Sequence, residues 1–488
     1  MVLTVVGKTL SVRNYRTYES NRQMSKSIDG FHWRSHSAFV IVAAGATLSL
    51  NDFLTFPVLV GQNGGSAFLL LYLLFLVVLG LPLLMAELLL GRLGRSDPPR
   101  SFEILAAQQK SSVFWKSAGF LSMLAAFMIV STFSVIAGWS LSYFFKSALG
   151  VFSAMSADGV SRTFNEFILD TERMMLWFTL FILLLVTISA QQLRNGVERF
   201  SLVLVPALFL LLVIGFVLAI YSPGFDQSVR VLLYVDFSNL SNDAPMLALQ
   251  RAFYTLALGL GAMMVYGSYL PANSSIGYSA ILVIAIDLLF SILIGLTINA
   301  LTFSTGFEPS LDSQYAYRIL PAVFNQLDSG YLGAALFFLM LVLAALTTSM
   351  ALIEASVSYF QRRYLFTRLK AAVLVGVCIW IMGFGSVVSY SVWNGEGFTI
   401  AVFFGDDAMR IVNNASFHDM MMFTSSRIIQ PLAALLICMF VAWVIPREMS
   451  FRELALPGKY YYESWNFMIR FITPVLLTIV LLNSIGII

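Results

Sequence analysis

The stretch of sequence that decides the fold is AAGATLSLNDFLTFPVLVGQNGG, residues 43–65. It belongs to an apolar run that begins near Ala38, and four polar residues interrupt that run halfway along: Thr47, Ser49, Asn51 and Asp52. An aspartate at mid-membrane depth costs roughly 2.5–3.5 kcal/mol on the lenient insertion scale, so such a residue indicates a function. Pro57 and the small residues nearby would let the helix break, and the freed backbone groups must then face protein, water or an ion. A kinked helix with a buried, hydrogen-bonded Asp52 is the alternative.

The composition is that of an integral membrane protein. Of the 488 residues, 59% are hydrophobic and 11% are charged, whereas about 25% of the residues of a soluble domain are charged. The long apolar segments predict transmembrane helices rather than a barrel. Both cysteines, Cys378 and Cys438, lie in such segments, which excludes a disulfide framework. The sequence has no phosphate-binding loop, nucleotide fingerprint, metal-ligand spacing or catalytic constellation, so ATP-driven transport, nucleic-acid binding and enzymatic activity are not expected.

We expect about eleven transmembrane segments. They lie roughly at 37–60, 66–91, 117–149, 174–192, 201–221, 244–270, 276–304, 330–360, 371–391, 420–445 and 464–486. Residues 1–30 are polar and lack the apolar core of a signal peptide, so they predict a cytoplasmic tail. Most of the Lys and Arg residues outside the segments fall on the side of this tail, as the positive-inside rule requires of the cytoplasmic side.

The sixth segment repeats the anomaly of the first. It carries four unusual residues at mid-membrane depth: Arg251, Thr255, Gly259 and Gly261. A glycine costs about 1 kcal/mol in a helix interior. Two interrupted helices in corresponding positions of two halves are the signature of an inverted-repeat secondary transporter, with its binding site at the breaks. The chain is therefore expected to comprise a tail (1–30), a first five-helix repeat (31–221), an inverted second repeat (244–446) and an additional eleventh helix (461–488).

Two further segments carry polar groups that need partners. Asp287 stands alone in the apolar stretch ILVIAIDLLFSILIG of the seventh segment, so it should face the interior and meet a cation or a donor. The eighth segment carries Thr347, Thr348 and Ser349, followed by Glu354. Hydroxyl groups are hard oxygen ligands, which suit a small cation such as Na⁺. Alternatively, these hydroxyls bond back to the carbonyl four residues earlier in the same helix.

An ordered set of motifs resembles the neurotransmitter:sodium symporter family, which includes the bacterial leucine transporter. Trp33 precedes the first segment, and NDFLTFPVLVGQNGGSAF leads into GLPLLMAE, similar to the family's GNxxRFPxxxxxNGGGAF and Gly-x-Pro-x-x-x-x-E. Further matches follow in the family's order: SVIAGWSL, NGVERF at 195–200, TLALGLGAMMVYGSY at 255–269, LPAVF at 320–324, ALTTS at 345–349 and RFITP at 470–474. The resemblance covers nearly all of residues 31–478 and implies an all-α membrane fold with 5+5 inverted repeats in which helices 1 and 6 are broken.

The resemblance also implies ion and substrate sites. The second sodium site maps to Gly45, Leu48, Ala344, Thr347 and Thr348. The first sodium site maps to Thr47, Asp52, Thr255 and Asp287. The chloride site of the animal members maps to Tyr72, Arg251, Thr255, Asp287 and Ser291, with arginine in place of a glutamine, so that chloride dependence stays open. The substrate pocket would be lined by Ser49, Asn51, Phe133, Tyr254, Ala257, Leu260 and Leu352, together with Thr47 and Thr348.

Three of these pocket positions depart from the family. Phe133 replaces the tyrosine whose hydroxyl holds the substrate carboxylate, Asn51 replaces a glycine, and Tyr254 replaces a phenylalanine lid. A substrate that is cationic or lacks a carboxylate becomes more plausible than in typical members. The usual substrate, a neutral amino acid, is therefore left open.

The gates of the family are also changed. The outer gate pair falls on Thr55 and Met422 and the inner gate pair on Gly30 and Arg362, although Trp33 and Tyr269 of the inner region match. Both partners differ in each pair, which indicates rebuilt gating. Arg251 lies one turn before Thr255, so it would face the outer vestibule and take over the gate charge or contact an acidic group of the substrate. A structural pair with Asp52 or Asp287 is the alternative.

Taken together, we expect a sodium-coupled symporter of a small amino acid or a related amine or acid, working by alternating access in a bacterial inner (plasma) membrane. Two carboxylates about 4 Å apart, such as Asp52 and Asp287, repel by ~4 kcal/mol at an effective dielectric constant of 20. One of them must bind a proton, or the pair must hold Na⁺, Arg251 or an amine. A proton-coupled transporter and a transport-inactive sensor or interaction protein of the same fold are the alternatives.

Overall fold

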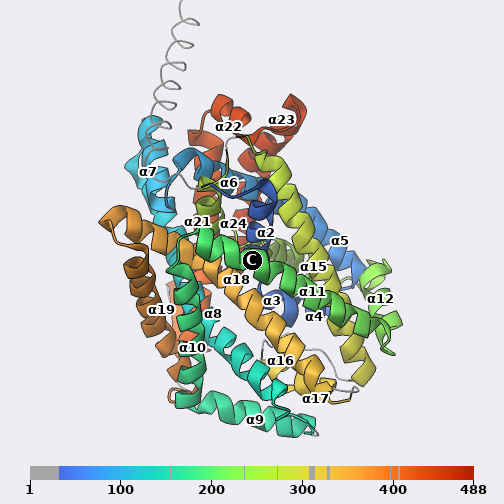
Figure 1. Cartoon of the computed structure of the whole chain (residues 1–488). Coiled ribbons are helices and arrows are strands. Elements are labelled where there is room, and N and C mark those ends of the chain that lie inside the picture. Colours follow the sequence, from blue (N-terminus) through green and yellow to red (C-terminus); the bar gives the residue numbers. More distant parts are fainter. Residues whose placement is uncertain are drawn as a thin grey trace, which may run out of the picture.

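The computed structural model of the chain describes residues 32–487, with gaps at 154, 236, 272, 307–313, 327–329, 396 and 405–406. It is a bundle of helices (Figure 1). In this described part, nine helices are long and apolar enough to cross a membrane. They contain α5 (Ser66–Phe75) with α6 (Leu81–Gly94), α8 (Lys116–Ala148), α10 (Thr171–Ser189), α11 (Arg199–Ile220), α15 (Ile276–Thr305), α18 (Gly330–Tyr364), α19 (Arg368–Tyr390), α20 (Phe417–Met422) with α21 (Gln430–Met439), and α23 (Lys459–Phe467) with α24 (Thr473–Ser484).

Two further segments are broken, as the sequence predicts. The first consists of α2 (His36–Thr47), α3 (Leu50–Leu54) and α4 (Phe56–Gln62), and the second of α13 (Ala244–Thr255) and α14 (Ala262–Ser268). With the nine long helices they account for the expected eleven spans. The boundaries of the two repeats stay a prediction, and the tail (1–30) lies outside the described residues.

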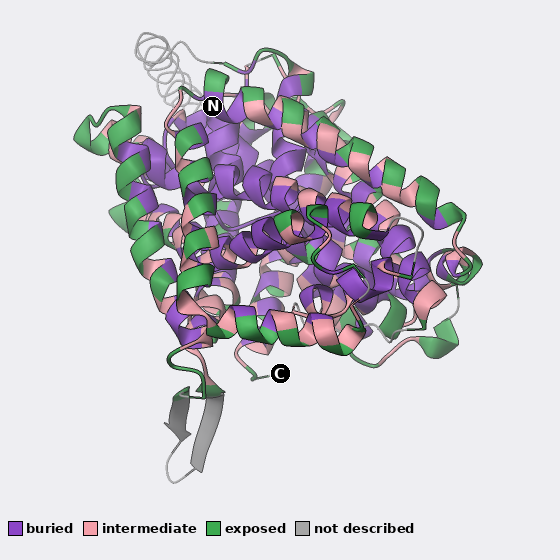
Figure 2. Cartoon of the chain, turned by 60° about the horizontal axis from the view of Figure 1, so that its bottom comes forward, coloured by how far each residue is buried: buried purple, intermediate pink, exposed green. Residues whose placement is uncertain are grey.

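Burial separates interior helices from lipid-facing ones. In the most apolar window of α18, 83% of the residues are buried, against 22% for the span that contains α11. The interior helix α18 packs against α2, α8, α11 and α19. Outer helices expose apolar side chains such as Leu183, Leu210 and Ile381, and exposed positions follow their outer faces in Figure 2. A bilayer is the solvent that such a surface requires.

Shorter elements cover the two ends of the bundle. On the side where the described chain begins, here called the tail side, lie α7 (Pro98–Gln108) and α22 (Arg447–Leu454). The opposite side, here called the hairpin side, carries α9 (Ala157–Leu169), α16 (Tyr315–Arg318) and α17 (Leu320–Phe324), and α12 (Phe225–Leu233) packs against α15. On this side, β1 (Phe398–Phe404) and β2 (Asp407–Ala415) form an antiparallel hairpin, and β2 contacts α20. This hairpin is absent from the all-α prediction, although the run FTIAVFF has the β-branched and aromatic residues of a strand.

Candidate ion- and substrate-binding site

The first helix break is built from its own residues. Helix α2 ends at Thr47, and Ser49 is extended, with φ −109° and ψ 164°. The backbone N–H of Ser49 donates to Asp52 Oδ2 at 2.6 Å, and the Ser49 hydroxyl donates to the same oxygen at 3.1 Å. Asp52 is thus the third residue of a new helix and forms a capping box with Ser49. The polar residues that interrupt the apolar run therefore start α3.

The second helix break is held from outside. Between α13 and α14, three residues have positive φ: Ala257 at 51°, Gly259 at 77° and Gly261 at 73°. The backbone N–H of Gly259 donates to Glu87 Oε1 of α6 at 2.6 Å. The side-chain amide of Gln430, the first residue of α21, donates to the carbonyl of Leu258 at 2.8 Å. Two helices distant in sequence thus satisfy the backbone of the unwound stretch, as the membrane interior requires.

The two breaks lie side by side. Thr255, the last residue of α13, places its hydroxyl 3.4 Å from Asp52 Oδ1 on α3. Helices α2 and α13 both end here, so their C-terminal ends, which carry partial negative charge, point at the same place. The centre of the bundle thus combines non-helical backbone with an electrostatic preference for cations.

The residues of the expected second sodium site come together between α2 and α18. The Thr348 hydroxyl lies 2.5 Å from the carbonyl oxygen of Leu48, at the end of α2. The Thr347 hydroxyl donates to the carbonyl of Ala344 at 3.0 Å within its own helix. A Cβ on Gly45 would lie 3.5 Å from Thr347 Cβ. Buried hydroxyl and carbonyl oxygens from two helices therefore face one another, which is a donor set that fits a small hard cation.

The side chains of the expected first sodium site also converge. The Thr255 hydroxyl lies 3.4 Å from Asp52 Oδ1 and 3.3 Å from Asp287 Oδ2, and both aspartates are fully buried. Thr47 donates its hydroxyl proton to the carbonyl of Ala44 at 2.9 Å, which leaves the lone pairs of that oxygen available to a cation. Oxygens 3.3–3.4 Å apart match the spacing of neighbouring ligands around a cation held at about 2.4 Å.

Arg251 lies against this cluster and forms an ion pair with Asp52 Oδ1 through Nη2. Its guanidinium carbon is 4.9 Å from the centre of the Phe56 ring, within the range of a cation–π contact. The side chain is only 7% exposed. Of the two alternatives for Arg251, the structure thus contains the structural pair with Asp52, and a role in the vestibule stays a prediction.

The expected anion site shares these residues. The Tyr72 hydroxyl donates to Asp287 Oδ2 at 3.5 Å. Within the described residues, the other oxygen of Asp287 and the buried hydroxyl of Ser291 have no hydrogen-bond partner. Two of the donors that a chloride ion would need, the hydroxyls of Tyr72 and Thr255, are therefore directed at a carboxylate, whereas that of Ser291 is not.

The expected substrate residues surround the breaks but differ in exposure. Asn51 is exposed and Phe133 is half-buried, whereas Ala257, Leu260 and Leu352 are buried. The half-buried Tyr254 donates to the carbonyl of Ser426 at 3.2 Å and lies 3.4 Å from the Ser484 hydroxyl. Phe133 offers no hydroxyl, and the amide of Asn51 is the accessible polar group of this set.

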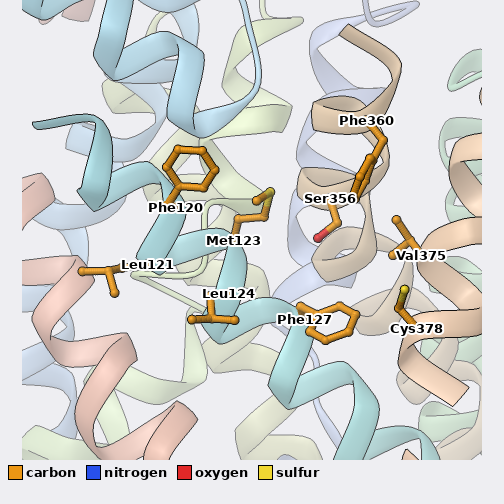
Figure 3. A pocket seen from close by; sticks show the side chains of 9 residues that line it. All are labelled: Phe120, Leu121, Met123, Leu124, Phe127, Ser356, Phe360, Val375 and Cys378. Atoms are coloured by element: carbon orange, nitrogen blue, oxygen red, sulfur yellow. The ribbon is translucent and has the colours of Figure 1, made fainter. Parts of the chain in front are cut away.

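Two cavities in the structure lie elsewhere. An apolar one of about 370 Å³ opens between α8, α18 and α19 (Figure 3). It is lined by Phe120, Leu121, Met123, Leu124, Phe127, Ser356, Phe360, Val375 and Cys378. A polar one of about 540 Å³ includes Arg318 and Asp419 and lies on the hairpin side. Neither is lined by an expected substrate residue, so the pocket at the breaks stays a proposal.

The two gate regions differ. On the tail side, Trp33 donates to the carbonyl of Tyr266 at 3.0 Å and packs edge-on against Tyr269. Arg362 donates to the carbonyl of Arg95 at 2.6 Å and to the Tyr269 hydroxyl at 3.2 Å. Its expected partner position, residue 30, lies outside the described residues. On this side, Tyr269 thus contacts both Trp33 and Arg362 of α18.

At the expected outer gate, the hydroxyl of Thr55 donates to the carbonyl of Asn51 in its own segment at 2.9 Å. Met422 accepts a hydrogen bond from Thr132 at 3.1 Å. Neither position carries a charge, so the two residues cannot form the ion pair of the family.

Two residues of the site are missing from the expected set. Glu87 and Gln430 hold the second break, and both are buried. A carboxylate in the apolar stretch LPLLMAELLL is the signal that could have identified Glu87, because an intramembrane acid needs a partner. Gln430 gave no comparable signal.

The chain matches proteins of one family along its whole described length. The family model "Sodium:neurotransmitter symporter family" matches residues 31–166 and 164–487. An uncharacterized sodium-dependent transporter of Bacillus subtilis is 32% identical over 93% of this chain and 98% of its own, and one of Haemophilus influenzae is 27% identical over 93% and 97%. The crystal structure of MhsT in complex with L-phenylalanine superposes with a TM-score of 0.81 at 31% identity, covering 93% of this chain and 99% of that one. The chain belongs to the sodium:neurotransmitter symporter family.

Proposed function

We propose that this chain is a sodium-coupled symporter that carries a small amino acid, or a related amine or acid, by alternating access. Its family consists of sodium-dependent membrane transporters, which are not enzymes. The observation that carries the proposal is the approach of the Thr348 hydroxyl to the Leu48 carbonyl across the first break. A cation held there would tie α2 to α18 and would leave when the two helices separate, which couples the ion to a rocking of one bundle against the other.

The substrate would bind beside the two breaks. The solved relative MhsT is complexed with L-phenylalanine, which supports an apolar amino acid. Phe133, however, cannot donate a hydrogen bond to a carboxylate. The exposed Asn51 could do so, so amino acids, amines and acids with a small apolar group form the screening set.

Transport into vesicles tests the proposal. We expect purified protein in liposomes to accumulate a substrate from this set when a Na⁺ gradient is imposed, and not with a proton gradient alone. The double variant Thr347→Val/Thr348→Ala should abolish accumulation and reduce the Na⁺-dependent rise in melting temperature, since a ligand that binds only the folded protein stabilises it. Thr302→Val is the matched control, because the Thr302 hydroxyl bonds only within α15, at 2.8 Å to Ile298. Unchanged Na⁺ dependence in the double variant would contradict the assignment of this site.

Two further experiments test whether chloride takes part in transport and which way the protein is oriented in the membrane. Replacing chloride by gluconate is expected to leave uptake unchanged, because Tyr72 and Thr255 already direct their hydroxyls at the Asp287 carboxylate.

The tail side is proposed to face the cytoplasm of a bacterium, with the protein in its plasma membrane. A tag at residue 1 should then be protected from protease added to intact spheroplasts.

A transport-inactive sensor is the second candidate, and the uncharged gate positions Thr55 and Met422 favour it. A sensor would show ligand-dependent and Na⁺-dependent stabilisation in the thermal screen without accumulation in the vesicles. A transporter shows both.

A further inference from the structure

The first ion site contains more acid than one monovalent cation needs. Asp52 and Asp287 place one oxygen each within 3.4 Å of the Thr255 hydroxyl, and neither side chain is exposed to solvent. A hydroxyl has one proton, so Thr255 can donate to one of these carboxylates at a time. Two buried carboxylates with one shared hydroxyl require positive charge from elsewhere.

Arg251 supplies one positive charge, and that charge pairs with only one of the two carboxylates, Asp52. Its Nη2 bonds Asp52 Oδ1, while Asp52 Oδ2 accepts from the backbone and the hydroxyl of Ser49. Asp52 is thus neutralised and held on both oxygens. Asp287 keeps one buried oxygen without a partner among the described residues. One negative charge therefore remains at the site, which matches one monovalent cation.

Removing the guanidinium would change the chemistry of this site. Two carboxylates, a hydroxyl and the negative ends of α2 and α13 would then converge with two uncompensated charges. This is the ligand set of a calcium site, since Ca²⁺ takes carboxylate, hydroxyl and carbonyl oxygens at about 2.3–2.6 Å and its affinity rises with the number of charged ligands. Na⁺ and Ca²⁺ are similar in size, so charge, not space, is what separates them here.

We propose that Arg251 sets the ion specificity of the first site: by neutralising Asp52, it keeps a two-carboxylate cage selective for a monovalent cation and excludes Ca²⁺. Specificity of this kind arises because the site binds Ca²⁺ poorly, not because it binds Na⁺ more tightly. The inference rests on the proposed function, sodium-coupled transport, and takes the first sodium site to lie among Asp52, Thr255 and Asp287, as the resemblance implies. It adds a reason why arginine and aspartate occur together at positions 251 and 52.

The test is ion binding by the purified full-length protein in detergent. Melting temperatures are measured in choline chloride with added NaCl or CaCl₂, and ⁴⁵Ca²⁺ binding is measured by equilibrium dialysis. The wild type and Arg251→Lys, which keeps the charge, should respond to Na⁺ and not to CaCl₂. Arg251→Gln should bind Ca²⁺ at least about 100-fold more tightly than the wild type, with a rise in melting temperature of about 3 °C or more at saturation.

The double variant Arg251→Gln/Asp52→Asn should lose the Ca²⁺ response again, because one of the two carboxylates is gone. Arg251→Met, which preserves side-chain length against Phe56, replaces the Gln variant if that variant does not fold. The Na⁺ response through Thr347 and Thr348 reports that a variant is folded. A folded Arg251→Gln or Arg251→Met protein that ignores Ca²⁺ overturns the proposal, and so does a wild type that binds Ca²⁺ equally well.

A failure of the proposed function has a different signature. In that case no variant, the wild type included, responds to Na⁺. A wild type that binds one Na⁺ while Arg251→Gln binds two Na⁺ and no Ca²⁺ also overturns the inference, because the guanidinium would then fill the site itself.

Discussion

The two helix breaks lie next to each other, yet they are stabilised in different ways. The first is capped by residues within it: Asp52 accepts from the backbone and hydroxyl of Ser49. The second depends on side chains of other helices, Glu87 of α6 and Gln430 of α21. A break capped locally keeps its shape when its surroundings move, because its partners move with it. A break held by α6 and α21 loses hydrogen bonds whenever it moves relative to those helices, so the shape of the second break depends on how they pack.

Asp52 offers the strongest test of the first break. Asp52→Ala removes the capping box and leaves Arg251 buried without its partner. Breaking a buried ion pair by removing one partner costs about 3–5 kcal/mol, and losing a cap adds about 1 kcal/mol. We expect little folded protein, or a melting temperature lowered by many degrees in detergent.

Two control variants separate the contribution of the helix cap to stability from that of the ion pair. Asp52→Asn keeps an acceptor for the backbone of Ser49 and should be less harmful. Asp52→Asn with Arg251→Gln removes both charges and should recover much of the lost stability, since the effects of substitutions at contacting residues are not additive. A wild-type melting temperature in Asp52→Ala would show that neither the cap nor the pair stabilises the protein.

Glu87 tests the second break. Glu87→Ala leaves the backbone N–H of Gly259 without an acceptor in a buried place, which costs about 2 kcal/mol. Glu87→Gln retains one acceptor oxygen, so its melting temperature should lie between those of the wild type and Glu87→Ala. The comparison of the two breaks fails if both substitutions are silent, because the unwound stretch would then not need α6.

Much of this arrangement could be predicted from the sequence, because the signals for it come from residues close together in the chain. The two breaks were visible as polar or glycine residues inside apolar runs, and the spacing Ser49-x-x-Asp52 is a capping signature that could have explained the first. The strand-forming run FTIAVFF could likewise have predicted the hairpin.

Other features could not be read from the chain. The pair of Arg251 with Asp52 joins residues 199 positions apart, and Arg251 could equally have faced the vestibule. The bond of Gln430 to Leu258 spans 172 positions and depends on how α21 packs beside the second break. Long-range partners follow from packing, which a single sequence does not contain.

The smallest expected effect concerns one methyl group in the second break. Ala257 has φ +51°, in the left-handed region that costs a residue with a Cβ about 1–2 kcal/mol. Ala257→Gly removes that strain but also gives the unfolded chain about 0.4–1 kcal/mol of additional conformational freedom. The net result should be a slightly higher melting temperature. Ala252→Gly in α13 is the matched control, because a glycine inside a helix destabilises it by about 1 kcal/mol. The same substitution should therefore have opposite signs five residues apart. A loss of stability in both variants would mean that Ala257 is not held in the left-handed conformation in the membrane.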